Sequence, residues 1–220
     1  MKKFLSASVM CADLMDMQKS VAELEKAGID YLHVDLMDGD FVPNITLGFD
    51  FVNQLKRITD IPLDVHMMVS NPARFIDRMN LSEDDIICVH YEADSNVRDT
   101  LTQIRKKGCK AGLAINPLTD ANLYREFADT IDMALVMTVT PGFAGQKIFE
   151  GAEQKVTQTR RIFEEEGYPE MLIEVDGNIT LENGRKLSRC GADIFVLGTS
   201  GLFINGKDMS QSASEFRAVL

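Results

Sequence analysis

The sequence predicts an α/β protein that folds as a (β/α)8 barrel, and three observations support this prediction. Eight short apolar segments alternate along the chain with eight segments of helical period. The apolar segments are almost continuously hydrophobic, as expected of parallel strands buried on both faces. Polar side chains gather at the ends of these segments, where such a barrel places its active site. With 220 residues, we expect a single domain, 1–220, at the short end of the usual ~200 to 400 residues.

Each expected strand is a run of apolar and β-branched residues that ends at a turn. In chain order, the expected strands are 5–10, 31–37, 63–69, 85–91, 110–116, 132–139, 171–177 and 194–200. Apolar residues at helical spacing predict helices over 14–27, 49–58, 71–79, 96–107, 121–127, 152–166, 181–189 and 211–220. A doubly wound open sheet is the alternative. It is disfavoured because no G-x-G-x-x-G follows the first strand.

The composition indicates a cytoplasmic protein. Hydrophobic residues make up 45% and charged residues 26% of the chain, which is ordinary for a soluble domain. The N-terminal segment reaches Asp13 without a long apolar core, so we expect no signal peptide. No apolar run approaches the ~20 residues of a membrane span. The four cysteines are scattered, as is typical of reduced thiols, and the net charge of -11 argues against nucleic acid and anionic membranes as partners.

The second expected strand carries the most informative residues. His33, Asp35 and Met37 alternate along 31–37, so their side chains share one face. A buried imidazole and a buried carboxylate are costly unless something uses them, and together they suit a divalent metal such as zinc, iron or manganese. On this strand alone, a hydrogen-bonded His–Asp pair in the core is the slightly favoured interpretation.

The other strands favour a functional site over a core pair. His66 ends the third strand, His90 ends the fourth and Asp176 ends the seventh. All three histidines of the chain therefore fall at strand ends, which a random scatter would rarely produce. In a barrel, these ends meet at the carboxyl face, where we expect the active site.

Several strands also carry polar pairs two residues apart. These pairs are Ser6 and Ser8, His33 and Asp35, Asp64 and His66, and Glu174 and Asp176. Each pair shares one face of its strand, and we expect that face to be the barrel interior. The lower carboxylates would then accept hydrogen bonds from metal-bound histidines. The alternative is that one or more pairs point outward, toward helix caps.

Five motifs together resemble the ribulose-phosphate 3-epimerase family of TIM barrels. They are LHVDLMDGDFVPNITLG, LDVHMMV, VTPGFAGQKIF, IEVDG and GADIFVLGTSGLF, and the resemblance runs from Leu5 through Phe203. It implies a barrel of the ribulose-phosphate-binding type, a phosphorylated ketose substrate and epimerisation at carbon 3. The variants VMCADL, FAGQ, VDGNIT and GTSGLF are similar to the D-allulose-6-phosphate 3-epimerase branch. The favoured reaction is therefore D-allulose 6-phosphate to D-fructose 6-phosphate, with D-ribulose 5-phosphate to D-xylulose 5-phosphate as the alternative.

The resemblance also implies a metal and two acid/base groups. One divalent ion per subunit (zinc, iron, manganese, cobalt or magnesium) would be held by His33, Asp35, His66 and Asp176. Epimerisation removes a proton from one face of a carbon and returns one to the other face, so two groups must flank it, and the resemblance assigns them to Asp35 and Asp176. One must start ionised and the other protonated. The metal would stabilise an enediolate as a Lewis acid.

Methionines and glycine-containing turns complete the expected site. Met37, Met68 and Met137 match family positions around the intermediate, although methionines that merely fill gaps in the core are an equal alternative. Glycines let backbone N–H groups approach phosphate oxygens, and a short helix after Ser200 would add its N-terminus. The residues expected to bind substrate are Ser8, His66, Gly142, Phe143, Ala144, Gly145, Asp176, Gly177, Asn178, Gly198, Thr199 and Ser200. Expected partners are the ketose phosphate and further copies of this chain in a homo-oligomer.

Other functions of phosphate-binding barrels fit less well. A lyase resembling orotidine-monophosphate decarboxylase would carry Asp-x-Lys on the third strand, where this chain has Asp64-Val65-His66. A Schiff-base aldolase would need a lysine at a strand end. A catalytically inactive phosphate-binding barrel is the alternative from another class, and it is disfavoured because both carboxylates and every expected ligand are present.

Overall fold

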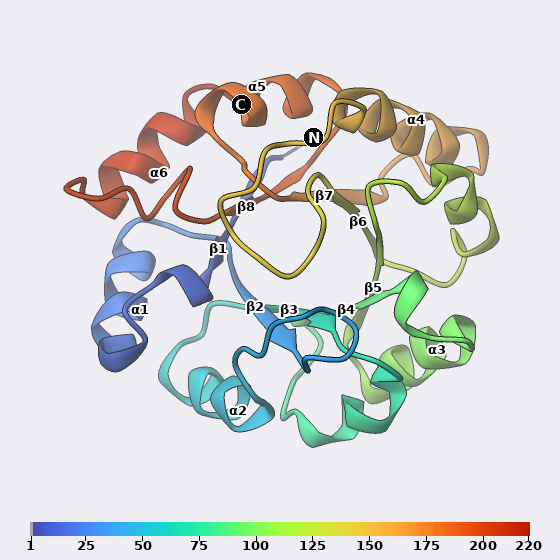
Figure 1. Ribbon diagram of the computed structural model, residues 1–220, viewed down its shortest axis with the longest axis horizontal. Coiled ribbons are helices and arrows are strands. Elements are labelled where there is room, and N and C mark those ends of the chain that lie inside the picture. The colour runs from blue at the N-terminus through green and yellow to red at the C-terminus, as the bar shows by residue number, and fades with distance from the viewer. Residues whose placement is uncertain (1) are drawn as a thin grey trace.

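A computed structural model describes residues 2–220 and shows a closed barrel of parallel strands surrounded by helices (Figure 1). The strands within these residues are β1 Phe4–Ser8, β2 Tyr31–Met37, β3 Leu63–Met68, β4 Ile86–His90, β5 Lys110–Ile115, β6 Met133–Met137, β7 Leu172–Asp176 and β8 Ile194–Leu197. Each strand pairs with its neighbours in the sequence, and β8 closes the barrel on β1. The predicted (β/α)8 barrel is confirmed.

The helices form the outer layer. They are α1 Met17–Lys26, α2 Phe49–Ile58, α3 Val97–Lys107, α4 Ala152–Glu165, α5 Leu181–Arg189 and α6 Met209–Arg217. Local capping residues mark some of their ends. The Thr180 hydroxyl accepts a hydrogen bond from the backbone N–H of Asn183 at the start of α5, and Gly108 ends α3 at a φ of +92°.

Two expected α-helices are instead 3₁₀ helices. The segment expected as 71–79 is η3, Pro72–Arg78, and the segment expected as 121–127 is η5, Ala121–Glu126. Both are too short to gain much from α-helical cooperativity. Both end in the i→i+3 hydrogen bonds of the tighter helix, from Met79 N to Ile76 O and from Phe127 N to Tyr124 O.

The first and last strands are shorter than predicted. β1 ends at Ser8, where the chain turns into η1, Val9–Cys11, while η2, Leu14–Asp16, precedes α1. β8 ends at Leu197, and the helix expected directly after Ser200 is a single turn in which the N–H groups of Leu202 and Phe203 donate to Gly198 O. Hydrophobic content does not reveal the end of β1, because the buried Val9 continues past it.

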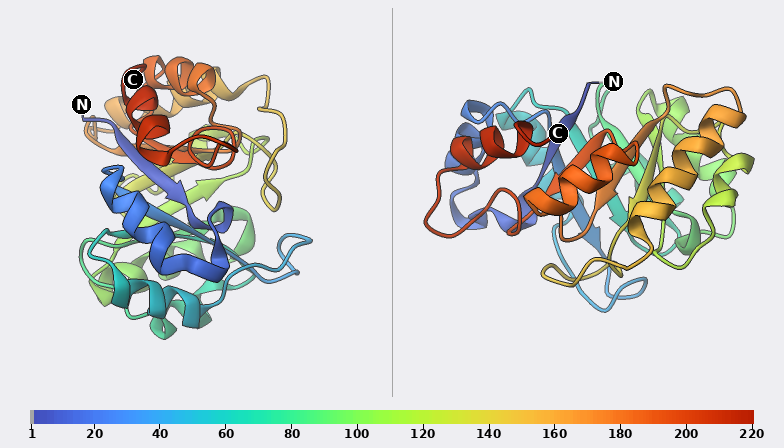
Figure 2. Two further views of the ribbon diagram at one scale, coloured as in Figure 1. Left: turned by 90° about the vertical axis from the view of Figure 1, so that its left-hand side faces the viewer. Right: turned by 90° about the horizontal axis from the view of Figure 1, so that it is seen from above.

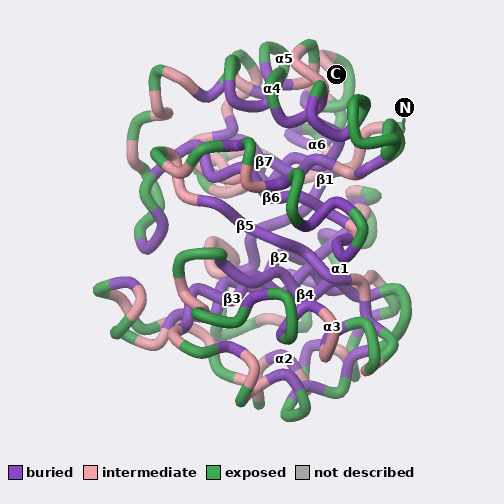
Figure 3. The backbone as a smooth tube through the Cα atoms, turned by 90° about the vertical axis from the view of Figure 1, so that its right-hand side faces the viewer, coloured by how far each residue is buried: buried purple, intermediate pink, exposed green. Residues whose placement is uncertain are grey.

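The barrel interior combines polar and apolar side chains. Of the eight side chains in the predicted polar pairs, seven are buried and Asp176 is half-buried, so the outward-pointing alternative is wrong. Apolar residues fill the rest of the interior: Tyr31, Ile86, Cys88, Ala114, Met133, Leu135, Met137, Val139 and Ile194. A larger apolar cluster packs the helices against the outside of the barrel. Figure 3 shows this division, with buried strands inside and exposed loops and helix faces outside.

An aspartate precedes each even-numbered strand and stabilises the amino end of the barrel. Each carboxylate accepts a hydrogen bond from a backbone N–H of the preceding odd-numbered strand. The N···O distances are 2.9 Å for Leu5 to Asp30, 2.8 Å for Leu63 to Asp85, 2.8 Å for Ala111 to Asp132 and 3.2 Å for Ile173 to Asp193. A buried N–H without a partner is costly, so these bonds hold the end of the barrel opposite the predicted site.

Two long loops extend from the carboxyl end of the barrel. They follow β2 and β6, and Figure 2 shows both projecting from the same side of the molecule. Asn44 Nδ2 in the first loop donates to Gly142 O in the second at 2.8 Å, so the loops are joined across the barrel mouth. Within residues 2–220, none of the helices has the length and apolar character that crossing a membrane requires.

Candidate active site

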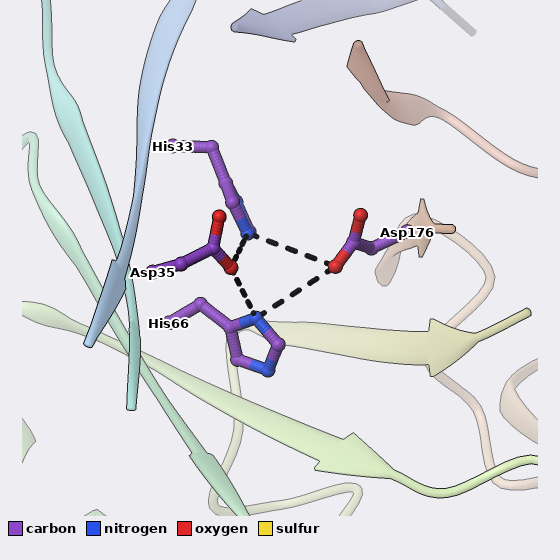
Figure 4. Close-up of side chains that lie close together, drawn as sticks. All are labelled: His33, Asp35, His66 and Asp176. Carbon is purple, nitrogen blue, oxygen red and sulfur yellow. Dashed lines mark hydrogen bonds and ion pairs between the residues drawn. The ribbon is translucent and has the colours of Figure 1, made fainter. Parts of the chain in front are cut away.

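Four side chains from three strands converge at the carboxyl end of the barrel. His33 and Asp35 come from β2, His66 from β3 and Asp176 from β7 (Figure 4). Asp35 Oδ1 lies 3.2 Å from both His33 Nε2 and His66 Nδ1. Asp176 Oδ2 lies 3.9 and 3.8 Å from the same two nitrogens, on the opposite side. The parallel register places Asp35 beside His66, which explains how two strands deliver three of the four groups.

The structure fixes which nitrogen of His33 faces this cluster. Its Nδ1 lies 2.5 Å from Asp64 Oδ2, and Ser6 Oγ donates to the same oxygen at 3.2 Å. An ionised carboxylate only accepts hydrogen bonds, so Nδ1 carries a proton. Burial alone would lower the pKa of His33, but Asp64 and Asp35 raise it well above its usual value, so Nε2 presents a lone pair only once a second proton has left the ring. Nε2 is buried without a hydrogen-bond partner in the described part of the chain. A lone pair facing the Asp35 oxygen is repulsive unless a proton or a cation lies between them.

The donor set fits a divalent cation. Each of the four residues offers one ligand atom, and these atoms all lie within 4.8 Å of one another. Ligands about 2.1 Å from a tetrahedral metal would be roughly 3.4 Å apart, which is close to the observed separations of 3.2 to 3.9 Å. Two imidazoles with two carboxylates suit zinc, iron or manganese. The cluster could therefore hold one metal ion.

The two carboxyl groups of the cluster have opposite pKa shifts. Burial alone would raise the pKa of Asp35, but His33 and His66 lower it far below its usual range. Burial raises the pKa of Asp176 to about 6, with a further increase from the Asp35 charge, although His33 acts in the opposite direction. Asp35 is therefore the stronger acid, and Asp176 keeps its proton more readily. A bound dication would lower both pKa values.

A buried carboxyl group lies beneath the cluster. Glu174 on β7 is fully buried, and neither of its oxygens has a hydrogen-bond partner within residues 2–220. Burial and the neighbouring Asp64 charge raise the pKa of Glu174 well above its usual value. Glu174 therefore keeps its proton more readily than an ordinary carboxyl group, while His33 and Ser6 surround Asp64, whose pKa is lowered by His33 against the effect of burial.

His90 lies next to the cluster and contacts it through His66. Its Nε2 is 2.8 Å from His66 Nε2, and its Nδ1 is 3.3 Å from Glu92 Oε2. Burial lowers the pKa of His90 to about 4, so this ring is neutral. Burial alone would raise the pKa of Glu92, but hydrogen bonds from His90, Thr119 and Asn116 lower it to about 2. The predicted position of His90 at a strand end is confirmed, whereas Glu92, which begins no expected element, carries no signal of this contact in the sequence.

A cavity opens above the four side chains. Apart from His66, every residue expected to bind substrate lines this cavity, as do Asp35 and the three predicted methionines. Met10 and Cys11 also line it. They were missed because the sequence extends the first strand to residue 10, whereas the chain turns at Val9 and brings both side chains to the mouth.

Glycine is required where β7 meets the cavity. Gly177 has a φ of +118°, and a Cβ atom on it would lie 2.5 Å from Val139 Cγ2. Asn178 follows with a φ of +51°. This left-handed turn directs the backbone around the cavity beside Asp176, and only glycine tolerates both its conformation and the close contact.

Comparison with known proteins supports an assignment to one family. The model of the ribulose-phosphate 3-epimerase family matches residues 4–203. The chain is 36% identical to the ribulose-phosphate 3-epimerase of Bacillus subtilis over 213 residues, covering 97% of each chain. It is 36% identical to the chloroplastic ribulose-5-phosphate-3-epimerase of Arabidopsis thaliana over 216 residues, covering 97% of this chain and 76% of that protein.

Solved structures at lower identity share the fold. A 3-hexulose-6-phosphate synthase superimposes with a TM-score of 0.70 at 15% identity and covers 100% of both chains. A mutant tryptophan synthase alpha-subunit from Pyrococcus furiosus gives a TM-score of 0.71 at 14% identity and covers 99% of this chain and 100% of that one. At these identities, the likeness concerns the barrel alone.

Proposed function

The chain belongs to the ribulose-phosphate 3-epimerase family, and from this premise we propose that it inverts carbon 3 of a phosphorylated ketose by proton transfer between two carboxyl groups. It is an enzyme of the isomerase class, a carbohydrate-phosphate epimerase. The single observation that carries the mechanism is the placement of Asp35 and Asp176. They face each other at one cavity and have opposite pKa shifts.

The carboxyl groups have distinct starting roles in this proposal. Asp35 is ionised and accepts the proton of carbon 3 from one face of the substrate. Asp176 keeps its proton more readily and donates it to the other face. In the reverse reaction, their roles exchange. Ser8 Oγ donates to Asp35 Oδ2 at 2.9 Å and holds that carboxylate in position.

The apolar lining supports proton transfer by excluding water. Met37, Met68 and Met137 are buried and line the cavity around the two carboxyl groups. Their side chains leave the carboxylates as the proton acceptors closest to the substrate. His33, Asp35, His66 and Asp176 would hold the metal. A bound divalent ion would supply Lewis-acid stabilisation of negative charge on the substrate oxygens.

We assign the substrate phosphate to the turns that follow β6, β7 and β8. The Gly142–Gly145 segment, Gly177 with Asn178, and Gly198 with Thr199 and Ser200 all line the cavity on the side away from β3 and β4. Backbone N–H groups at glycine-containing turns bind anions without a basic side chain. This assignment also suits a chain with a net charge of -11, which offers no general attraction for phosphate.

Two substrates are candidates, and each has a separate argument. The relatives described above are named for ribulose phosphate, which favours D-ribulose 5-phosphate. The FAGQ and GTSGLF variants favour the longer D-allulose 6-phosphate, because they lie in the turns that must accommodate one more hydroxylated carbon. We give D-ribulose 5-phosphate precedence, and the preference for D-allulose 6-phosphate stays a prediction from motif variants alone.

Steady-state kinetics on both sugars tests the proposal. Misplacing the reacting carbon by about 1 Å costs roughly 100-fold in rate, so the preferred substrate should stand out in kcat/KM. Conversion of either sugar supports the epimerase, and the ratio of the two values identifies the substrate. Purified, metal-loaded protein that converts neither would favour the inactive phosphate-binding barrel. The homo-oligomeric state and the cytoplasmic location stay predictions.

A further inference from the structure

Three histidine rings lie in a row across consecutive strands. The His33 and His66 ring centroids are 5.2 Å apart, and those of His66 and His90 are 5.0 Å apart. His90 is fully buried, and Phe41 from the loop after β2 packs on it at 4.9 Å between ring centroids. The ring is therefore held between His66 and an apolar cover, where an unpaired nitrogen would be costly.

The contact between His66 and His90 requires a proton in a defined place. Their Nε2 atoms are 2.8 Å apart, a hydrogen-bond distance. A neutral imidazole has one donor and one acceptor nitrogen, so one ring donates and the other accepts. The contact alone permits either direction.

Glu92 decides the direction. Its Oε2 is 3.3 Å from His90 Nδ1, and its Oε1 accepts hydrogen bonds from Asn116 N at 2.8 Å and from the Thr119 hydroxyl. A carboxylate only accepts, so His90 Nδ1 carries the proton of its ring. His90 Nε2 is then the acceptor, and the donor must be His66 Nε2. The opposite arrangement would place the Nδ1 lone pair of His90 against the carboxylate.

We propose that His90 and Glu92 are positioning residues that keep a proton on Nε2 of His66, so that its Nδ1, which lies 3.2 Å from Asp35 Oδ1, is the nitrogen available to a cation between them. This inference rests on the metal site of the proposed function. His33 achieves the same result through the direct contact of its Nδ1 with Asp64. His33 therefore presents Nε2 to the cluster, because its Nδ1 contacts Asp64. His66 presents Nδ1, because its Nε2 contacts His90 and through it Glu92.

The substitution Glu92→Gln tests this arrangement sharply. Asn116 N and the Thr119 hydroxyl retain the amide oxygen of the new side chain, which turns its NH₂ group toward His90 Nδ1. His90 Nδ1 must then accept, His90 Nε2 donates, and the proton of His66 moves to Nδ1. The lone pair that faces the cluster is lost. Glu170, which is exposed, provides the matched control Glu170→Gln.

Two measurements on the full-length protein decide the outcome. Long-range ¹H–¹⁵N spectra of the three histidines report each tautomer in chelator-treated protein, and competition with a chelating dye reports the affinity for Zn²⁺. In the wild type and in Glu170→Gln we expect a proton on His66 Nε2, in addition to any proton that the contact with Asp35 holds on Nδ1 when no metal is bound. We expect Glu92→Gln to show His66 Nε2 without a proton and a Zn²⁺ affinity lower by about 10- to 100-fold.

His90 variants separate positioning from packing. His90→Gln keeps an acceptor for His66 and a donor for Glu92, so it should retain Zn²⁺ affinity within a few fold, whereas His90→Phe should lose it as Glu92→Gln does. His66 Nε2 without a proton in the wild type, or unchanged Nε2 protonation and Zn²⁺ affinity in Glu92→Gln, would overturn the proposal. Neither readout uses epimerase activity, so a protein with the expected tautomers that converts no ketose phosphate contradicts the proposed function alone.

Discussion

Asp35 and Asp176 approach the same two imidazole nitrogens from opposite sides of the barrel mouth, Asp35 at 3.2 Å and Asp176 at 3.8 to 3.9 Å. This arrangement places both carboxyl groups at one cavity and lets one cation contact both. It also separates their proton affinities, because Asp35 lies closer to the rings than Asp176. Epimerisation needs this asymmetry in a pair of otherwise identical groups.

Metal removal should abolish activity. His33 Nε2 and Asp35 Oδ1 are mutually repulsive acceptors without a cation or proton between them. Dialysis against a strong chelator should therefore leave a folded but inactive protein, and adding zinc, iron, manganese, cobalt or magnesium should restore turnover. Elemental analysis and a coupled assay check this prediction. Full activity in demonstrably metal-free protein would contradict the metal assignment.

Asp176→Asn should slow epimerisation by about 100-fold or more, since acid–base groups contribute roughly 10²- to 10⁴-fold. Asp35→Asn should do the same, because each carboxyl group serves a different face. Both variants also alter a metal ligand, so metal content must be measured in each preparation. A metal-loaded Asp176→Asn protein with the wild-type rate would rule out the two-carboxylate mechanism.

Relative to the wild type, Glu174→Gln should raise the free energy of unfolding more at pH 8 than at pH 4. The folded-state pKa of Glu174 is raised above its unfolded value. Above the unfolded pKa, the unfolded chain releases a proton that the folded chain keeps, so stability falls as pH rises. Glutamine is neutral at both values and removes this loss. Thermal unfolding of both proteins at the two pH values measures the effect, and an equal shift at both would show that Glu174 is not held protonated.

Asp64→Asn is the matched comparison on the other side of His33. The asparagine amide can donate to Nδ1, and the His33 proton would then move to Nε2, facing the cluster. We expect Zn²⁺ affinity to fall by about 10- to 100-fold. Glu174→Gln leaves the His33–Asp64 contact intact and should retain Zn²⁺ affinity. Equal affinities in the two variants would indicate that Asp64 does not orient His33.

Asp132→Ala should destabilise the fold without slowing catalysis. The substitution leaves the buried N–H of Ala111 without its partner at 2.8 Å, a cost of about 1–3 kcal/mol. Asp132→Asn keeps an acceptor and should recover much of the stability, and the exposed Asp84→Ala is the surface control. Denaturant unfolding of the three variants checks the order. Asp132→Ala as stable as Asp84→Ala would contradict the role given to the amino-end aspartates.

The sequence was most informative where one strand alone determines the outcome. Alternation along β2 and β3 predicted which polar side chains share a face, and the gathering of polar residues at several strand ends favoured the inward face for His33, Asp35 and His66. The sequence is less informative where a contact between two side chains depends on how neighbouring strands are aligned. Strand register brings His66 to His90, and the chain after β4 brings Glu92 into contact with His90. The length of β1 determines the turn that brings Cys11 to the cavity. The amino-end aspartates could have been noticed as a repeat, but their backbone partners could not be assigned.

Isotope incorporation from solvent tests the central claim most directly. When the preferred ketose phosphate is converted in D₂O and the reaction is stopped early, proton transfer through Asp35 and Asp176 requires one deuterium at carbon 3 of the product, because the group that donates has exchanged with solvent. Proton and deuterium NMR of the product measures this. We predict product labelled at carbon 3 in the metal-loaded wild type. Product formed at the normal rate without deuterium would show direct transfer and contradict the two-carboxylate account.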